Sequence, residues 1–407
     1  MVKTLAIETS CDDTSVGIVD FDGQVFSVDS LLAYSQIDDH QKYWWVVPEI
    51  ASRLHSDKII EVIKNIGFDK IREVDCISVT IHPWLPGSLV VGKAVASLLS
   101  SYFAKPLVYV NHIYWHLFSL LLDRNISDIQ FPMVVLTASG GHNDIYVVTN
   151  SEFKIQNAEW LERREFGWYK VAKVWYTLDD AAGECFDKVA RMLGGPYPGG
   201  QRISEQALKS RKYQVSSIKT DNELRDPDFS GEQITNNESE ASELHRDEWS
   251  VDDIKFKRIF LSKDNFEFSF SWMKSQVFFL LKQFEKNWKI KRLENWKLEI
   301  PEELICDIAY EFQEAVVEVM VKKLVRAGIA FDAKTLWLAG GVSCNDRLRE
   351  YLEIYVKEKT PEVVVLKPVK KVYSMDNAAM IGLAGILEYN AEWIMKNEKW
   401  IIPLLLE

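Results

Sequence analysis

The sequence has few cysteines and no arrangement of them that would build a structure. Five occur in 407 residues, and no two are separated by the spacing C-x-x-C: Cys11, Cys76, Cys185, Cys306 and Cys344. An odd number of scattered cysteines does not indicate a disulfide framework, and without the C-x-x-C spacing the sequence does not indicate a thiolate zinc site. We therefore expect a protein of a reducing compartment.

Long apolar runs are also missing. The longest, residues 88–103, is interrupted by Lys93 and by serines, so it is a poor candidate for a membrane-spanning helix. The N-terminal stretch MVKTLAIETS has neither a charged leader nor a long apolar core of the kind that directs export. We expect a cytoplasmic protein with no membrane association.

Basic side chains are scarce in one segment only. The formal net charge is −12, and residues 221–253, with 12 acidic and 2 basic side chains, hold −10 of it, which leaves −2 for the rest. This segment is rich in Ser and Asn and has no periodic apolar residues, a composition typical of a disordered insertion. Without it, the charge neither favours nor excludes a nucleic-acid partner.

Two segments share one pattern: an apolar run, a turn of small and polar residues, and a second apolar run. Residues 3–21 read KTLAIE, TSCDDTS and VGIVDF, and residues 132–148 contain PMVVLT, ASGGHND and IYVV. Each pattern predicts a hairpin, and two such hairpins predict an internally duplicated fold. Strands and helices alternate between them, and the chain is too long for one core, so we expect an α/β protein of two facing halves.

Further elements follow from periodicity and turn residues. We expect helices over 48–66 and from near Gly87, strands over 74–81 and 106–110, a helix over 179–195 that contains Asp187, two helices over 301–327, and a strand, turn and helix over 335–352. The basic run 286–297 is interpreted as the solvated face of a helix.

Three turns carry groups suited to a nucleotide. The Ser-Gly-Gly turn at residues 138–142 can present backbone N–H groups to an anionic oxygen, because glycine has no Cβ to block the approach. Asp12 and Asp13 occupy the equivalent turn of the first hairpin and can orient water or a metal, or accept a proton. The segment GGVSCN, residues 340–345, lies where α/β proteins usually place ligands. Each can be an ordinary turn, but together they favour a nucleotide cleft.

Two histidines lie four residues apart in NHIYWHLF, residues 111–118. On a helix, His112 and His116 would face the same side and could reach a single ion, and imidazole suits zinc or iron. Packed histidines give the same spacing, so both interpretations stay open. A metalloprotease of the H-E-x-x-H type needs Glu after the first histidine as its base. Ile113 stands there, which argues against that class.

Nine segments, in this order, resemble one family. ETSCDDTSVGIVD, VVPEIASRLH, NHIYWHL, SGGH, DDAAGECFDK, YPGG, FSFSWMK, LAGGVSCN and MDNAAMIG match the motifs of the tRNA threonylcarbamoyl-adenosine transferases, TsaD in bacteria, formerly described as O-sialoglycoprotein endopeptidases. The resemblance implies the duplicated actin/Hsp70-like ATPase (RNase H-like) fold, with a nucleotide and metal cleft between two subdomains. These would be residues 1–110, completed by about 377–407, and residues 111–376, interrupted by 221–253.

The resemblance also implies a reaction. Threonylcarbamoyl-adenylate would bind in the cleft, and the exocyclic amine of the adenosine 3′ of the anticodon, in tRNAs reading ANN codons, would attack its carbamoyl carbon and release AMP. Asp12 or Asp13 would take the amine's proton, although the family often has Glu where Asp13 stands. A small subunit of the same fold and an ATPase subunit are implied as partners.

The residues that the resemblance assigns form two groups. One divalent ion, iron rather than zinc, would be held by His112, His116 and Asp376. The substrate would be bound by Ala138, Ser139, Gly140, Gly141, His142, Asp187, Gly200 and Asn345. Two other functions stay open. A small-molecule kinase of the same fold would have no use for the metal ligands, and a non-catalytic partner of a transferase would be expected to lose them.

One residue type departs from the family pattern. Tryptophan stands where the family carries glycine at six positions: Trp44, Trp45, Trp84, Trp115, Trp175 and Trp272. Glycine is scarce, at 19 of 407 residues, against roughly 7% in average proteins. Our hypothesis is that the gene reads UGA as glycine and was translated here with UGA as tryptophan, and UGG codons at these positions would contradict it. If the tryptophans are genuine, we expect Trp84 and Trp115 to crowd the cleft.

Overall fold

The computed structural model describes residues 1–150, 162–166, 169–210, 254–258, 260, 267–287, 290–292 and 298–397. The acidic segment 221–253 therefore lies outside the described residues, and its predicted disorder stays a prediction. Among the described helices, none combines the length and the apolar character that crossing a bilayer requires.

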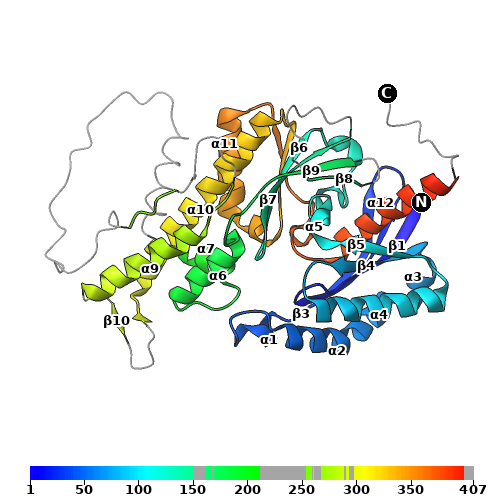
Figure 1. Cartoon of the computed structure of the whole chain (residues 1–407), viewed down its shortest axis with the longest axis horizontal. Helices are drawn as coiled ribbons and strands as arrows, with labels where there is room; N and C mark the ends of the chain where they lie inside the picture. Colours follow the sequence, from blue (N-terminus) through cyan, green and yellow to red (C-terminus); the bar gives the residue numbers. More distant parts are fainter. Residues whose placement is uncertain are drawn as a thin grey trace.

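The first predicted hairpin belongs to a five-stranded mixed sheet (Figure 1). Its strands are β1 (Val2–Glu8), β2 (Asp13–Phe21), β3 (Phe26–Ser35), β4 (Cys76–His82) and β5 (Leu107–Asn111). Strands β1, β2 and β3 pair antiparallel, whereas β4 and β5 run parallel to β1. The spatial order is β3-β2-β1-β4-β5.

The second hairpin starts a six-stranded sheet that repeats this arrangement. Its strands are β6 (Met133–Ala138), β7 (Asn143–Thr149), β8 (Glu162–Phe166), β9 (Tyr169–Tyr176), β12 (Thr335–Ala339) and β13 (Val364–Leu366). The order β9-β7-β6-β12-β13 has the same directions as β3-β2-β1-β4-β5, and β8 adds one edge strand. The predicted duplicated α/β fold is confirmed.

Alternating side chains explain how helices cover both faces of the first sheet. Leu5 and Ile7 on β1 pack toward α2 (Pro48–Ile66) and α4 (Pro86–Phe103), whereas Ala6 points to the opposite face, toward α12 (Ala378–Asn397). Figure 1 shows the sheet between these helices. Each large aliphatic side chain buried in this way stabilises the fold by about 1.5–3 kcal/mol.

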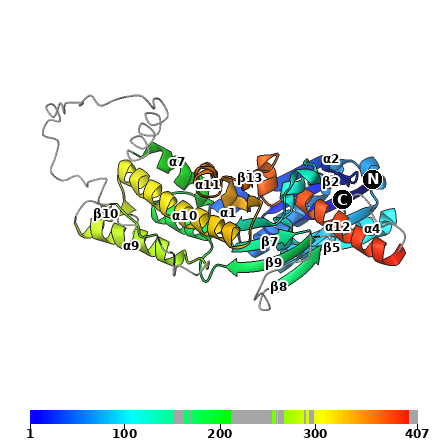
Figure 2. The same ribbon diagram turned by 90° about the horizontal axis from the view of Figure 1, so that it is seen from above.

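The second sheet has the same alternation, and one of its faces joins the two halves. Val134 and Leu136 pack with α6 (Ala182–Met192) and α10 (Glu302–Ala330), whereas Met133 and Val135 belong to the same buried cluster as Ala6 and the residues of α12. Figure 2 shows α9 (Ser271–Lys286) and α10 at the end of the molecule opposite α4 and α12. The remaining α-helices of the described residues are α1 (Ile37–Gln41), α3 (Phe68–Arg72), α5 (His112–Trp115), α7 (Gly199–Lys209) and α11 (Asp346–Lys359).

Two helix predictions are wrong. Residues 302–327 form part of one helix, α10, because no proline or glycine interrupts the pattern between Pro301, which caps the helix, and Gly328. In the basic run, Lys286 ends α9, and β10 (Lys291–Arg292) pairs antiparallel with β11 (Leu298–Glu299), so Lys291 and Arg292 belong to a strand rather than to a helix face. The predicted subdomain boundaries, 1–110 with about 377–407 and 111–376, are not tested by these elements and stay a prediction.

Candidate active site

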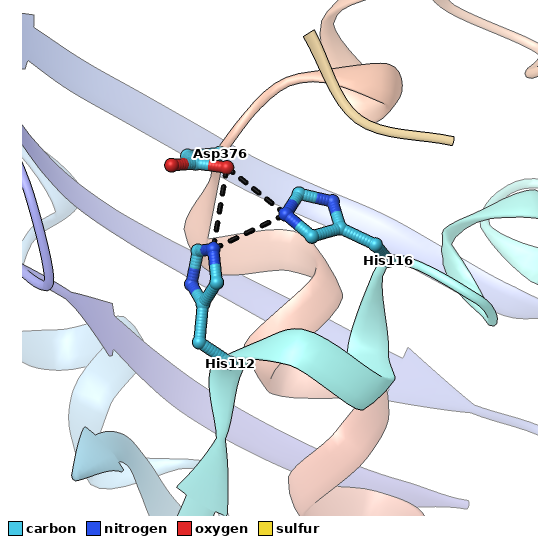
Figure 3. Close-up of side chains that lie close together, drawn as sticks. All are labelled: His112, His116 and Asp376. Atoms are coloured by element: carbon cyan, nitrogen blue, oxygen red, sulfur yellow. Dashed lines mark hydrogen bonds and ion pairs between the residues drawn. The ribbon is translucent and has the colours of Figure 1, made fainter. Parts of the chain in front are cut away.

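The two histidines and Asp376 form a triangle beside the first sheet (Figure 3). His112 opens the single turn of α5, directly after β5, and His116 follows that turn, so both imidazoles lie on one side. Nε2 of His112 and Nε2 of His116 are 3.1 Å apart. Asp376, just before α12, places Oδ1 3.3 Å from His112 Nε2 and 3.0 Å from His116 Nε2.

These distances suit a shared metal ion. Two nitrogen or oxygen atoms bound to one ion at about 2.0–2.1 Å in tetrahedral geometry lie about 3.3 Å apart. Both histidines are buried, whereas about a third of the Asp376 side chain, 35%, is exposed. Three protein ligands with one accessible side are the arrangement of a catalytic metal site, which keeps a coordination position for substrate.

A buried carboxylate that the sequence analysis did not single out orients His112. Glu8, the last residue of β1, lies with Oε2 3.1 Å from His112 Nδ1, and Ser10 Oγ lies 3.3 Å from the same nitrogen. Thr80 Oγ1 and the backbone N–H of Ser10 donate to the Glu8 carboxylate. A carboxylate on the second nitrogen fixes the tautomer and ring orientation of a metal-binding histidine. In the sequence, the only feature that could have indicated this role of Glu8 is its position at the start of the motif ETSCDD.

The charges of this cluster perturb its titration. Burial lowers the pKa of His112, but the Asp376 and Glu8 carboxylates outweigh it and raise this pKa to about 10. Burial raises the pKa of Asp376, but the two imidazoles hold it well below its usual range. Without metal, a protonated His112 therefore balances two carboxylates, and a divalent cation would replace that proton.

The change Glu8→Gln is expected to weaken metal binding 10–100-fold, the range measured for partners of metal ligands. The amide keeps the size of the side chain but removes the charge that orients His112. Metal affinity can be measured by competition with a chelator. Glu303→Gln, an exposed change at the start of α10, serves as the control, and equal affinities for the two variants would contradict the role of Glu8.

The Ser-Gly-Gly turn joins β6 and β7 in the predicted position. The backbone N–H groups of Gly141 and His142 donate to Ser139 Oγ over 3.3 and 3.1 Å, and Ser139 N–H donates to the His142 carbonyl over 2.9 Å. These two amides thus point toward one oxygen atom. An anionic oxygen of a ligand could replace the hydroxyl as their acceptor.

Two other glycines allow neighbouring segments to approach this turn. A Cβ on Gly183, in the first turn of α6, would lie 2.5 Å from the Ser139 carbonyl oxygen and 2.8 Å from the Gly140 nitrogen. Gly340 has φ +84°, and a Cβ there would lie 2.5 Å from the Ala138 carbonyl oxygen. The turn therefore touches both the start of α6 and the GGVSCN segment, so two of the three predicted turns meet.

The acidic turn of the first hairpin is largely buried. Burial, with the neighbouring charge of Asp12, raises the pKa of Asp13 to about 7, and burial also raises the pKa of Asp12. Among the described residues, Asp13 Oδ1 has no hydrogen-bond partner. One side chain of this turn is thus suited to accept a proton near neutral pH.

The residues expected to bind the nucleotide differ in their surroundings. Burial raises the pKa of Asp187 to about 6 although Gly199 N–H donates to its carboxylate, and the charges of Glu184 and, less strongly, Asp12 add to the rise. Gly200 is the second residue of α7. Asn345 caps α11 through Leu348 N–H, and its Nδ2 donates to the side chains of α7 and α10, namely Ser204 and Gln313. Its amide therefore ties three helices together.

The six tryptophans have different environments. The expectation that Trp115 crowds the metal ligands is wrong, because its side chain is fully buried in the core beside Phe118, and the ligand atoms converge regardless. Trp44 has φ +67°, a conformation that side chains other than glycine rarely adopt. Trp84 does lie at the site, against Gly141. Trp45 and Trp272 are exposed, and Trp175 packs against Phe331.

Known proteins resemble the chain over most of its length. The family model TsaD, tRNA N6-adenosine threonylcarbamoyltransferase, matches residues 29–383. A tRNA N6-adenosine threonylcarbamoyltransferase from Bdellovibrio bacteriovorus is 35% identical over 393 residues, 95% of this chain and 92% of that protein. One from Thermosipho africanus is 34% identical over 388 residues, 95% of this chain and 94% of that protein. Among solved structures, a ROK hexokinase from Thermus thermophilus is 10% identical, with a TM-score of 0.43, over 96% of this chain and 99% of that chain.

The family model and the relatives agree with the motifs and with the duplicated fold. The small-molecule kinase is not favoured by these matches. The chain belongs to the TsaD family of tRNA N6-adenosine threonylcarbamoyltransferases.

Proposed function

We propose that the chain transfers the threonylcarbamoyl group of threonylcarbamoyl-adenylate to the exocyclic amine of the adenosine 3′ of the anticodon, releasing AMP. The observation that carries the proposal is the triangle of His112, His116 and Asp376 in a member of this family. A kinase would need phosphate-binding turns but not these ligands.

The reaction changes charge at two places that the protein would have to stabilise. The attacking amine must lose a proton, and the departing AMP gains negative charge on its phosphate. Asp13, with its unpaired Oδ1, would take the proton. The amides of Gly141 and His142, at the turn that touches the start of α6, would stabilise the phosphate. Asp187 and Gly200 would contact the nucleotide, and Asn345 would support that site through its helix contacts.

His112, His116 and Asp376 would hold one divalent ion, for which we favour iron over zinc. When bound, such an ion would supply a Lewis acid for the carbonyl or threonyl oxygens of the substrate. Glu8, Asp12 and Asp13 place negative charge in this region that would repel an anionic substrate, and a divalent ion held here would offset it.

Transfer is expected to increase with pH in the acid range and to level off at or below pH 7 if Asp13 is the base. Only the carboxylate can accept a proton, so the rate should fall tenfold per pH unit below the pKa of Asp13, which burial raises to about 7. A cation nearby would lower the pKa of Asp13 and shift this rise in rate to lower pH. Single-turnover rates between pH 5 and 8 measure the rise. Asp13→Asn should remove it and slow transfer by roughly 10²–10⁴-fold, whereas Asp13→Glu should restore it. An unchanged profile in the Asp13→Asn variant would exclude this role.

The proposal can be tested in cells that have been depleted of their own transferase. The chain is produced there together with its partner subunits, which we propose to be a small protein of the same fold and an ATPase. Mass spectrometry of nucleosides from the tRNA should detect threonylcarbamoyl-adenosine, formed in the cytoplasm. Unmodified adenosine in the presence of the folded, metal-loaded chain would contradict the proposed function.

Recoding of UGA as glycine stays our hypothesis for the six tryptophans. The left-handed backbone of Trp44 supports it, because glycine adopts φ near +67° without strain and tryptophan does not.

A further inference from the structure

The side chain of Trp84 lies between the metal ligands and the glycine turn. It follows β4 at the carboxyl end of the strand, where the next N–H, of Leu85, donates to the Ser10 carbonyl over 3.0 Å. The centroids of the Trp84 and His112 rings are 6.2 Å apart at 84°, and those of Trp84 and His142 are 5.0 Å apart at 68°. One indole from the first sheet thus reaches the turn of the second.

The indole lies directly on the turn that we assign to the phosphate. A Cβ built on Gly141 would be 2.3 Å from Cη2 and 2.7 Å from Cζ3 of Trp84. With the indole in this position, a Cβ at residue 141 would clash, and only a shift of the indole would relieve the clash. The six-membered ring therefore covers the backbone next to the amides that would receive an anionic oxygen.

The polar end of the indole is not satisfied in this position. Trp84 Nε1 is buried and, among the described residues, has no hydrogen-bond partner. A buried N–H without an acceptor costs free energy that a second position, or a ligand oxygen, would recover. The present placement is thus one that the side chain can leave without losing a hydrogen bond.

We propose that a tryptophan at position 84 controls the entry of the acyl-adenylate and limits the size of the acyl group that the site accepts, an inference that concerns the chain with tryptophan at this position and not one recoded to glycine. This inference rests on the proposed function. A ligand with its phosphate on residues 139–142 and its acyl group at the metal ligands must cross the space between His112 and His142, where the indole lies. Binding therefore requires displacement of the indole. A smaller residue at position 84, including the glycine that recoding would give, removes that requirement.

A role of Trp84 in holding the adenine predicts the opposite change in affinity. If the indole were a platform on which the adenine stacks, its removal would weaken binding. If it only obstructs, its removal strengthens binding, and the gain is larger for a ligand with an acyl group than for AMP, which need reach only the turn.

The test is calorimetric titration of the full-length, metal-loaded chain with AMP and with a non-reactive sulfamoyl analogue of threonylcarbamoyl-adenylate. Trp84→Gly is expected to bind the analogue at least tenfold more tightly than the parent, with a smaller gain for AMP, and Trp84→Phe should be intermediate. Trp272→Gly, an exposed site on α9, should leave both affinities unchanged.

Other outcomes separate this inference from the proposed function. Equal affinities for the parent and both Trp84 variants, or weaker binding by the variants, would overturn the inference and leave the proposed function standing. No binding of either ligand by any variant would overturn both. Thermal unfolding and metal content show whether Trp84→Gly is folded, and if it is not, the Trp84→Phe comparison decides by the same criteria.

Discussion

Replacing Asp376 by asparagine is expected to remove the bound metal and to slow threonylcarbamoyl transfer by roughly 10³-fold. Asparagine keeps the shape of the side chain but loses the charge that both imidazoles face over 3.3 and 3.0 Å. Metal-ion catalysis of this kind supplies several kcal/mol, and each 1.36 kcal/mol corresponds to tenfold in rate. Metal content, measured by plasma mass spectrometry, and the single-turnover transfer rate should fall together.

Replacing either metal-site histidine by alanine is expected to lower the free energy of unfolding more than Asp376→Asn does. His112→Ala leaves the buried Glu8 carboxylate without the imidazole that balances it, and breaking a buried ion pair on one side costs about 3–5 kcal/mol. Asp376→Asn is therefore the more informative variant, and His82→Ala, an exposed histidine at the end of β4, is its control. Full metal content with an unchanged rate in the Asp376→Asn variant would exclude the proposed metal site.

Gly183→Ala is expected to slow transfer by roughly 10²–10³-fold, the loss that follows removal of one donor to a developing anion. The new Cβ would lie 2.5 Å from the Ser139 carbonyl oxygen and 2.8 Å from the Gly140 nitrogen. Both are backbone atoms, so no rotamer change relieves the clash, and the glycine turn must move relative to α6.

The matched control for Gly183→Ala is Gly341→Ala. Gly341 lies in the neighbouring glycine segment, and a Cβ there would have nothing within 4 Å. Single-turnover transfer rates and affinities for the sulfamoyl analogue should decrease in the first variant only. Equal effects of the two substitutions would mean that the approach of α6 to the turn is not what shapes the phosphate site.

The parts of the fold that the sequence predicted have strong local patterns. The hairpins of β1 with β2 and of β6 with β7 alternate apolar runs with short polar turns, and helix α2 was predicted with its observed limits, 48–66. Strand β3 was missed because its buried and exposed positions do not alternate regularly. The division of 301–327 into two helices failed because α10 continues without a break from Glu302 to Ala330, although no single local signal in the sequence shows its full length.

The residues of the candidate site were also predicted only in part from the sequence. The spacing of His112 and His116 indicates a shared ion, but Asp376 lies more than 250 residues further along the chain, so only the family resemblance could add it. Glu8 reads as the end of an apolar strand, and its contact with His112 depends on the pairing of β1, β4 and β5. The direction of Trp115, into the core rather than toward the ligands, depends on tertiary packing that no local pattern contains.

The most direct measurement follows the carbonyl carbon of the substrate. The purified, metal-loaded chain with its partner subunits is given threonylcarbamoyl-adenylate labelled at that carbon and an unmodified tRNA that reads an ANN codon. The account predicts label on the adenosine 3′ of the anticodon, one AMP released for each label transferred, and loss of both in the Asp376→Asn variant. Release of AMP with no label on the tRNA, or transfer that continues unchanged in that variant, would contradict it.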